Sequence, residues 1–330
     1  MPSQSPDVHQ WICDACVPPV AAADWADAPP TREPPSVGFL AMTQESARLD
    51  LPVRIIVPHS GLDGFRHALY SLWTAFPHAC ELAWRFFLRD TRASYRQSLL
   101  GYLWIVLPPL ANTAVWVLLN KAEVIRIASG AVPYPVFVLI STVLWAAFNG
   151  AVTSTLASVN EARGILNKVN FPHESLAYAA FLKSFVDAVI PAVMLLPASW
   201  LYHVPVRTCA LLFPLSLVAA LLLGLAIGLI LVPLASLYSD VSRTAQLVLR
   251  FGFFVTPVIF PLPTTGWARS LMLLNPLTPI IVSGRTWMAG SGESMPLAFA
   301  AVFGGSLAVI AMGLVLFKVA LPHLIERLSA

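Results

Sequence analysis

The chain has 330 residues, of which 57% are hydrophobic and 11% charged, and its formal net charge is +3 at pH 7. Soluble domains carry about 25% charged residues, so this composition excludes an ordinary soluble protein. A net charge this small gives no reason to expect nucleic acid as a partner. We therefore expect an all-α polytopic membrane protein.

Residues 1–79 form the N-terminal region that we expect on the cytoplasmic side. Residues 1–36 are rich in proline and alanine, and such a segment has too little to pack, which predicts disorder. Met42 opens a stretch that looks more like the start of an ordered protein, so both Met1 and Met42 are candidate natural starts.

An amphipathic helix is predicted over residues 80–98. Its arginines recur at steps of four, three and four, which places them within an arc of roughly 60° at about 100° per residue. These arginines are Arg85, Arg89, Arg92 and Arg96. Aromatic and apolar residues fill a separate face, namely Trp84, Phe87, Leu88, Thr91 and Tyr95. Such a helix is expected to lie flat in the membrane interface beside lipid phosphates.

Six apolar stretches of about 20 residues, the length that spans a bilayer, follow within the membrane domain at residues 99–325. The predicted spans are 101–120, 133–157, 176–202, 209–236, 245–262 and 297–320. Prolines interrupt residues 263–295, which we interpret as two short re-entrant helices between spans five and six. Lysine and arginine placement predicts that both termini, including the tail at 326–330, are cytoplasmic.

Two connections on the cytoplasmic side are candidate contact surfaces. Residues 158–175 form a long connection in which we expect a short helix at about 160–169. Leu166, Val169 and Phe171 are apolar residues where water is expected, which favours a docking surface over a plain linker. The second connection is the loop 238–243.

Several ordered motifs resemble the ABC-2 type permeases of polysaccharide export. They are RDTRASYRQSLLGYLWIVLPPL from Arg89, NEARGILNKVNFPHES from Asn160, YSDVSR from Tyr238, TPVIFP from Thr256 and LNPLTPII from Leu274. The resemblance covers about residues 80–328 and is nearest to exporters of O-antigen, capsular polysaccharide or teichoic acid.

The resemblance implies a homodimer in the bacterial inner membrane, paired with two copies of a separate ATPase subunit. ATP is then bound on the partner and no cofactor on this chain, which contains no GxxxxGK[ST] phosphate loop. It further implies that the 160–172 segment is the main ATPase contact and the loop 238–243 the smaller one. The candidate contact residues are Asn160, Glu161, Arg163, Leu166, Phe171, His173, Tyr238, Asp240 and Arg243. Ser239 stands where the family commonly has an arginine, which weakens the case for Asp240 as a salt-bridging contact.

Two interpretations remain open for the arginine stripe. The arginines either anchor the helix on anionic lipid, or at least one clamps the diphosphate of a lipid-linked glycan that enters sideways. Trp116, Trp145 and Phe148 are candidate channel-lining residues, because sugar C–H faces stack on aromatic rings, although aromatic residues also gather at membrane interfaces.

Gly224 and Gly228 have a small-xxx-small spacing that predicts close helix packing, either within a subunit or between subunits. No paired carboxylates or clustered histidines indicate a catalytic or metal site. The alternatives are an ABC-2 exporter of a drug or lipid and, from another class, a membrane enzyme that acts on lipid-linked sugars.

Overall fold

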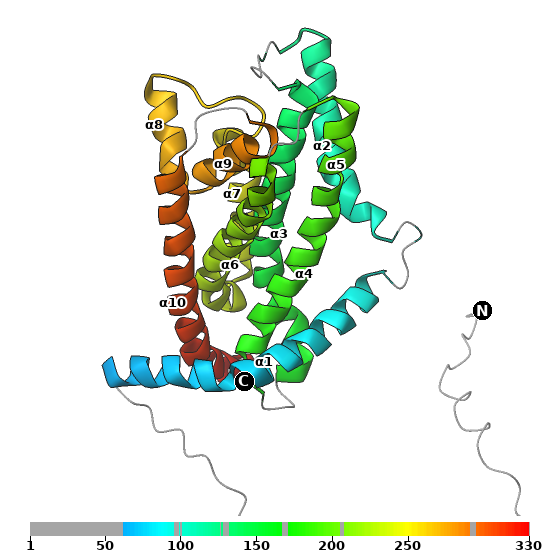
Figure 1. Cartoon of the computed structure of the whole chain (residues 1–330). Coiled ribbons are helices and arrows are strands. Elements are labelled where there is room, and N and C mark those ends of the chain that lie inside the picture. The colour runs from blue at the N-terminus through cyan, green and yellow to red at the C-terminus, as the bar shows by residue number, and fades with distance from the viewer. Residues whose placement is uncertain are drawn as a thin grey trace, which may run out of the picture. The chain divides into compact units, whose positions relative to one another are not determined.

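The computed structural model describes residues 62–95, 99, 101–125, 127, 132–166, 171–204, 208–290 and 295–329. The chain divides into two units, Met1–Val57 and Pro58–Ala330, and everything described here belongs to the second. All regular secondary structure among the described residues is helical, as Figure 1 shows. The expected disorder of residues 1–36 and the choice between Met1 and Met42 lie outside the described residues.

The first helix, α1 (Leu62–Tyr95), is longer than the predicted helix at 80–98 and runs through Pro77 without ending. It lies across the ends of α4 and α10 in Figure 1. Its buried stripe consists of Ala79, Ala83, Phe86 and Phe87. This packing buries Phe87 against protein, whereas Trp84 is 52% exposed from the protein and is free to face lipid.

The remaining elements follow in chain order. They are α2 (Leu103–Lys121), α3 (Tyr134–Leu166), α4 (Glu174–Val193), α5 (Leu195–Leu201), the 3-10 helix η2 (Thr208–Leu212), α6 (Phe213–Leu237), α7 (Ser239–Val255), α8 (Trp267–Leu274), α9 (Leu277–Ala289) and α10 (Pro296–Ser329).

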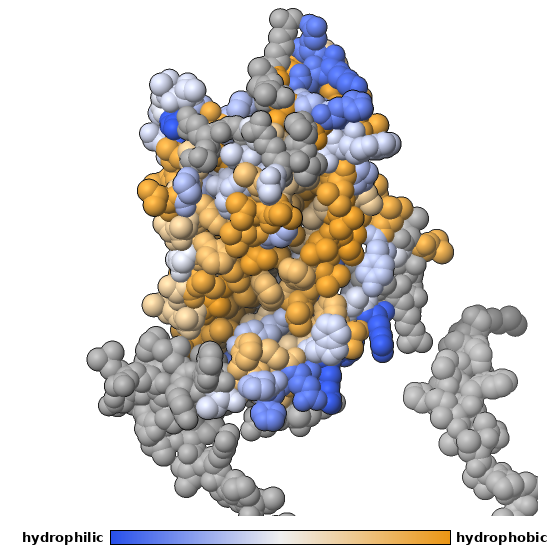
Figure 2. Space-filling model, in the orientation of Figure 1, coloured by the Kyte–Doolittle hydropathy of each residue, from blue (hydrophilic) through white to orange (hydrophobic). Residues whose placement is uncertain are grey.

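Five stretches of helix in the described residues are long and apolar enough to cross a membrane. They are Leu103–Lys121, Tyr134–Ala162, Glu174–Leu201, Thr208–Leu237 and Pro296–Lys318, and they match five of the six predicted spans. On the face shown in Figure 2, hydrophobic residues form a band with hydrophilic residues toward both ends, as a bilayer requires.

The predicted fifth span, 245–262, differs from the structure. The helix here, α7, starts earlier at Ser239 and stops at Val255 after 17 residues. It stops because Pro257 has no N–H to continue the ladder and disfavours the helical conformation at Thr256, whose backbone is extended. The segment 238–243 is therefore not a loop: only Tyr238 is extended, and the rest forms the first turns of α7.

The predicted separate helix at about 160–169 is also corrected, because α3 continues without a break to Leu166. The sequence Asn160-Glu161-Ala162-Arg163 contains no helix breaker, and Gly164 alone costs only about 1 kcal/mol within a helix. Residues 167–170 lie outside the described part of the chain.

Helices α3 and α6 form the centre of the membrane domain. In the most apolar 18-residue stretch of their spans, 78% and 67% of the residues are buried. A Cβ added to Gly224 would lie 2.5 Å from the Phe148 carbonyl oxygen, and one added to Gly228 would lie 2.6 Å from the Thr155 Cβ. Both glycines therefore allow α6 to touch α3, so the small-xxx-small spacing serves packing within one subunit.

Candidate functional site

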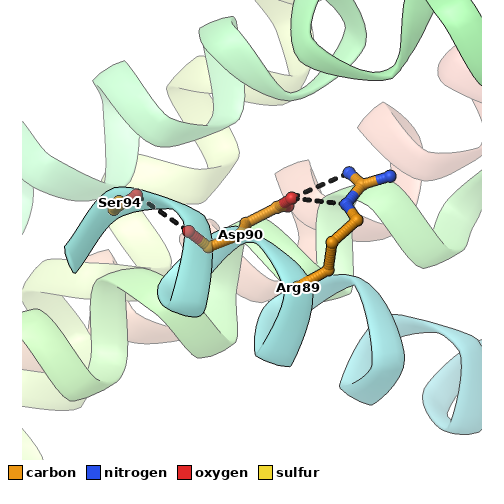
Figure 3. A network of polar contacts seen from close by, with 3 residues as sticks. All are labelled: Arg89, Asp90 and Ser94. Atoms are coloured by element: carbon orange, nitrogen blue, oxygen red, sulfur yellow. Dashed lines mark hydrogen bonds and ion pairs between the residues drawn. The ribbon is translucent and has the colours of Figure 1, made fainter. Parts of the chain in front are cut away.

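The described arginines of α1 are exposed, and two of them have carboxylate partners on the same helix. Arg85 Nη2 lies 2.6 Å from Glu81 Oε1. Arg89 donates from Nε to Asp90 Oδ1 at 2.8 Å (Figure 3). Its guanidinium lies 5.0 Å from the centre of the Phe86 ring. Arg92 is exposed, and Arg96 lies outside the described residues. Two arginines of the stripe are therefore partly neutralised by acids on the same helix, Glu81 and Asp90.

Beside Arg89, a cleft of about 240 Å³ opens between α1, α3 and α4. Its lining is mostly polar or small and consists of Arg89, Asp90, Thr153, Ser154, Ala157, Ser158, Glu161, Leu176, Ala179, Ala180 and Lys183. Of these residues, Arg89 and Glu161 were site candidates from the sequence. The cleft brings an α1 arginine and an expected ATPase-contact residue to one hollow.

The expected main ATPase contact begins at the end of α3. Asn160 and Glu161 are exposed there, whereas the side chains of Arg163 and Leu166 lie outside the described part of the structure. Phe171 is half-buried, with its ring centre 5.4 Å from that of Phe86 on α1. The Phe171 ring therefore contributes to the junction with α1 and offers less free apolar surface than its sequence position predicts.

The segment after this contact ends in a buried ion pair. Glu174, the first residue of α4, is 3% exposed, and its Oε1 lies 2.9 Å from Lys318 Nζ on α10. The neighbouring His173 packs against Phe171, and burial lowers the pKa of its imidazole. The end of the candidate contact is thus joined to α1 through Phe171 and to α10 through Glu174.

The smaller expected contact is exposed at the start of α7. Tyr238 is 63% exposed, and Asp240 Oδ1 lies 3.7 Å from Arg243 Nη1. Both charged side chains are more than 80% exposed, so this pair contributes little to stability and leaves its charges accessible to a partner.

The three candidate channel residues belong to one series of aromatic contacts. Trp116 on α2 meets Phe254 on α7 at a centroid separation of 6.4 Å, and Phe254 meets Phe253 at 5.4 Å. The series continues from Phe253 to Trp145 at 5.6 Å and from Trp145 to Phe148 at 5.7 Å. Phe148 and Phe253 are buried, Trp116 and Trp145 are partly exposed, and Phe254 is 54% exposed, so the Trp116–Phe254 end offers the most surface in this series to a substrate.

Two residues in this region were missed from the sequence. The pairing of Phe254 with Trp116 is a long-range contact that no spacing indicates. Arg285 on α9 is 4% exposed, donates to the Pro257 carbonyl and lies 4.2 Å from the Phe137 ring centre. An arginine within an apolar segment is the signal that could have singled it out.

This is the arrangement of a polytopic helical membrane protein whose polar features lie at helix ends and in one cleft. No group of three or more His, Cys, Asp or Glu side chains that could hold a metal occurs in the described part of the chain. Residues 81–288 match the family model for the ABC-2 type transporter, and the chain belongs to this family.

Relatives from three bacteria share most of this region. The O-antigen export system permease protein RfbA of Myxococcus xanthus is 29% identical over 198 residues, 59% of this chain and 75% of that protein. The polysialic acid transport protein KpsM of Escherichia coli is 24% identical over 241 residues, 70% and 90% of the two chains. RfbA of Klebsiella pneumoniae is 24% identical over 209 residues, which are 60% of this chain and 76% of that protein. These relatives are named as export permease and transport proteins.

Proposed function

We propose that this chain is the transmembrane subunit of an ABC exporter that moves a lipid-linked polysaccharide across the bacterial inner membrane, powered by a separate ATPase subunit. The observation that carries the proposal is the match of residues 81–288 to the ABC-2 family together with relatives named as O-antigen export and polysialic acid transport proteins. O-antigens and polysialic acid are both polysaccharides, so the substrate class is shared although the polymers differ.

Six crossings, with both termini cytoplasmic, fit the chain best if α7 is the short fifth crossing. Its 17 residues are about 25 Å long, near the thickness of about 30 Å of a hydrocarbon core. Tyr134 at the start of α3 donates to the Ile259 carbonyl at 3.2 Å, just after α7 ends. The start of α3 and Ser239, the first residue of α7, lie at opposite ends of the domain, so this bond supports a crossing by α7. The short helices α8 and α9 would then lie at the outer face as the re-entrant pair.

A homodimer interface, with the glycan path beside it, is proposed along α2 and α7. Only 17% of the residues in the most apolar stretch of α2 are buried within the subunit, which leaves an extensive face for a second copy. On α7, Arg250 and Phe254 are exposed one turn apart. An arginine at membrane depth normally faces a water-filled cavity or other protein and not lipid tails. A path shared by two copies supplies both water and aromatic surface there.

Docking of two ATPase copies is proposed at the end of α3 and the start of α7. The first surface presents Asn160 and Glu161, and the second presents Tyr238, Asp240 and Arg243. Both lie at the same end of the membrane domain, because α3 and α6 run in the same direction and α7 begins directly after α6. ATP is bound on the partner in this arrangement.

The exposed arginines of α1 are proposed to meet phosphates as the lipid-linked glycan approaches from the membrane. Arg85 and Arg92 are accessible at the interface, and a guanidinium can hold a phosphate with two parallel hydrogen bonds. Membrane lipids supply the same chemistry, so anchoring and substrate capture are two uses of one surface.

Deletion of the chain from its natural host tests the proposal. We expect surface polysaccharide to disappear and the lipid-linked polymer to accumulate inside the cell, with both effects reversed by the wild-type chain. Unchanged surface polysaccharide, accompanied by sensitivity to a drug or altered lipid export, would instead indicate another ABC-2 substrate class.

A further inference from the structure

The cleft between α1, α3 and α4 has on one wall a lysine that belongs to a candidate membrane span. Lys183 is half-buried and lies nine residues into α4, about 13 Å along the helix from its first residue. Within the described side chains, no carboxylate lies at ion-pair distance from Lys183. Ionisable residues inside a membrane domain are normally paired or functional. The cleft can therefore receive an anion from outside the chain.

Further hydrogen-bond donors line the same cleft. The Ser154 hydroxyl on α3 has no hydrogen-bond partner among the described residues and is free to donate. Arg89 is held in place by Asp90 and by the Phe86 ring, which uses only part of its five N–H groups. A lysine, an oriented arginine and a free hydroxyl together form a suitable set of donors for phosphate oxygens.

The size of the cleft restricts what can enter. Its volume of about 240 Å³ exists because Ala157, Ala179 and Ala180 leave space between the helices. That volume equals about eight water molecules at about 30 Å³ each, and it is smaller than the pockets of about 300–1,000 Å³ that enclose drug-sized ligands. A space of this size suits a small charged headgroup better than a whole drug-sized ligand.

The charges that line the cleft restrict which headgroup can bind. Arg89 is already paired with Asp90, so Lys183 supplies the uncompensated positive charge and Glu161 the uncompensated negative one. Glu161 is exposed at the end of α3, so it lies toward the rim of the cleft. A headgroup with one phosphate and one ammonium group complements both charges, and a second negative charge would be repelled by Glu161.

We propose that this cleft binds the headgroup of a zwitterionic phospholipid, with the phosphate at Lys183, Ser154 and Arg89 and the ammonium group toward Glu161. The bound lipid would fill the space between α1 and the α3–α4 pair and hold α1 in place. The cleft shares Arg89 with the proposed phosphate-binding face of α1 and Glu161 with the proposed ATPase contact, but lipid binding in it does not depend on which substrate is exported.

Native mass spectrometry of the full chain tests this site. The purified protein, with its ATPase partner, is taken from nanodiscs of phosphatidylethanolamine and phosphatidylglycerol without glycan carrier. The variants are Lys183→Met, Lys183→Arg and, as a matched control, Lys121→Met at the exposed end of α2. We expect retained phosphatidylethanolamine on the wild type, Lys183→Arg and Lys121→Met, and at least about a tenfold loss on Lys183→Met.

Equal retention on Lys183→Met, in a protein whose circular dichroism and size-exclusion profile match the wild type, would overturn the site. Retention of phosphatidylglycerol alone would overturn the charge assignment. Displacement of the lipid by millimolar inorganic phosphate would indicate a free anion as the ligand and overturn the headgroup. Because the readout is lipid binding, a failed export assay leaves this result unaffected.

Discussion

Lys318 of α10 lies 2.9 Å from the buried carboxylate of Glu174, the residue that starts α4 directly after the proposed ATPase contact. The pair joins the first and last thirds of the membrane domain at one point. A displacement of the end of α3 by the proposed ATPase partner would thus be transmitted to α10 as well as to α4.

A double-mutant cycle tests this connection. Removing one partner of a fully buried ion pair typically costs about 3–5 kcal/mol, because the other charge is left uncompensated. The Lys318 side chain is 33% exposed, so solvent screening makes the cost here smaller. We expect Glu174→Gln and Lys318→Met each to lower the stability of the purified protein, and the double variant to be less destabilised than the sum of the two. Chemical denaturation monitored by tryptophan fluorescence measures the three values, and strictly additive losses would show that the charges do not interact.

A pH dependence is expected at His173. Burial lowers the pKa of its imidazole in the folded state, so the unfolded chain binds the proton more readily at acidic pH. Stability from this residue is therefore present above the usual histidine pKa of about 6.5 and is lost as the pH falls below it. Glu174 favours the protonated form and Lys318 opposes it, and both are weaker influences than burial.

Unfolding measured between pH 5 and pH 7.5 in wild type and His173→Gln checks this sign. The wild type should lose stability toward pH 5 more steeply than the variant. Parallel curves would show that His173 is not the group responsible.

The contact between α3 and α6 predicts a sharp difference between two glycines. A methyl group at Gly228 would lie 2.6 Å from the Thr155 Cβ, whereas one at Gly304 on α10 would meet nothing within 4 Å. Overpacking costs about 1–3 kcal/mol, whereas alanine in an open helical site gains up to about 1 kcal/mol. Gly228→Ala should therefore lower the melting temperature and Gly304→Ala should not, and equal behaviour would contradict the tight packing.

Arginine-to-lysine substitutions along α1 separate anchoring from phosphate capture. Lysine keeps the charge but cannot make the two-pronged hydrogen bond of a guanidinium. If capture is the role, replacing Arg85, Arg89, Arg92 and Arg96 together should reduce export by at least about tenfold while membrane insertion stays normal. Export at the wild-type level from the inserted variant would leave lipid anchoring as the role.

Sequence patterns predicted the five long apolar spans because each is continuous over about 20 residues. They predicted α7 poorly, since Arg243 and Arg250 on its exposed face weaken the apolar run and Pro257 ends the helix early. The end of α3 was misjudged because a polar helical sequence reads as a connection when the apolar pattern stops.

The candidate site was predictable only where its residues lie close in sequence. The arginine spacing on α1 follows from helical periodicity. The contacts between Glu174 and Lys318 and between Trp116 and Phe254 depend instead on how helices far apart in the chain pack. Periodicity reports which face of a helix is apolar, and it does not report which helix covers that face.

The most direct test of the central claim is glycan transport in inside-out membrane vesicles that contain this chain and its ATPase partner. With lipid-linked polysaccharide on the outer surface of the vesicles, ATP should drive the polymer into the lumen, where an added glycosidase cannot reach it. Vesicles without the chain, or with an ATPase unable to hydrolyse ATP, should leave the polymer fully digestible. Protection of the glycan that is equal with and without this chain would contradict its role as the transmembrane subunit of a polysaccharide exporter.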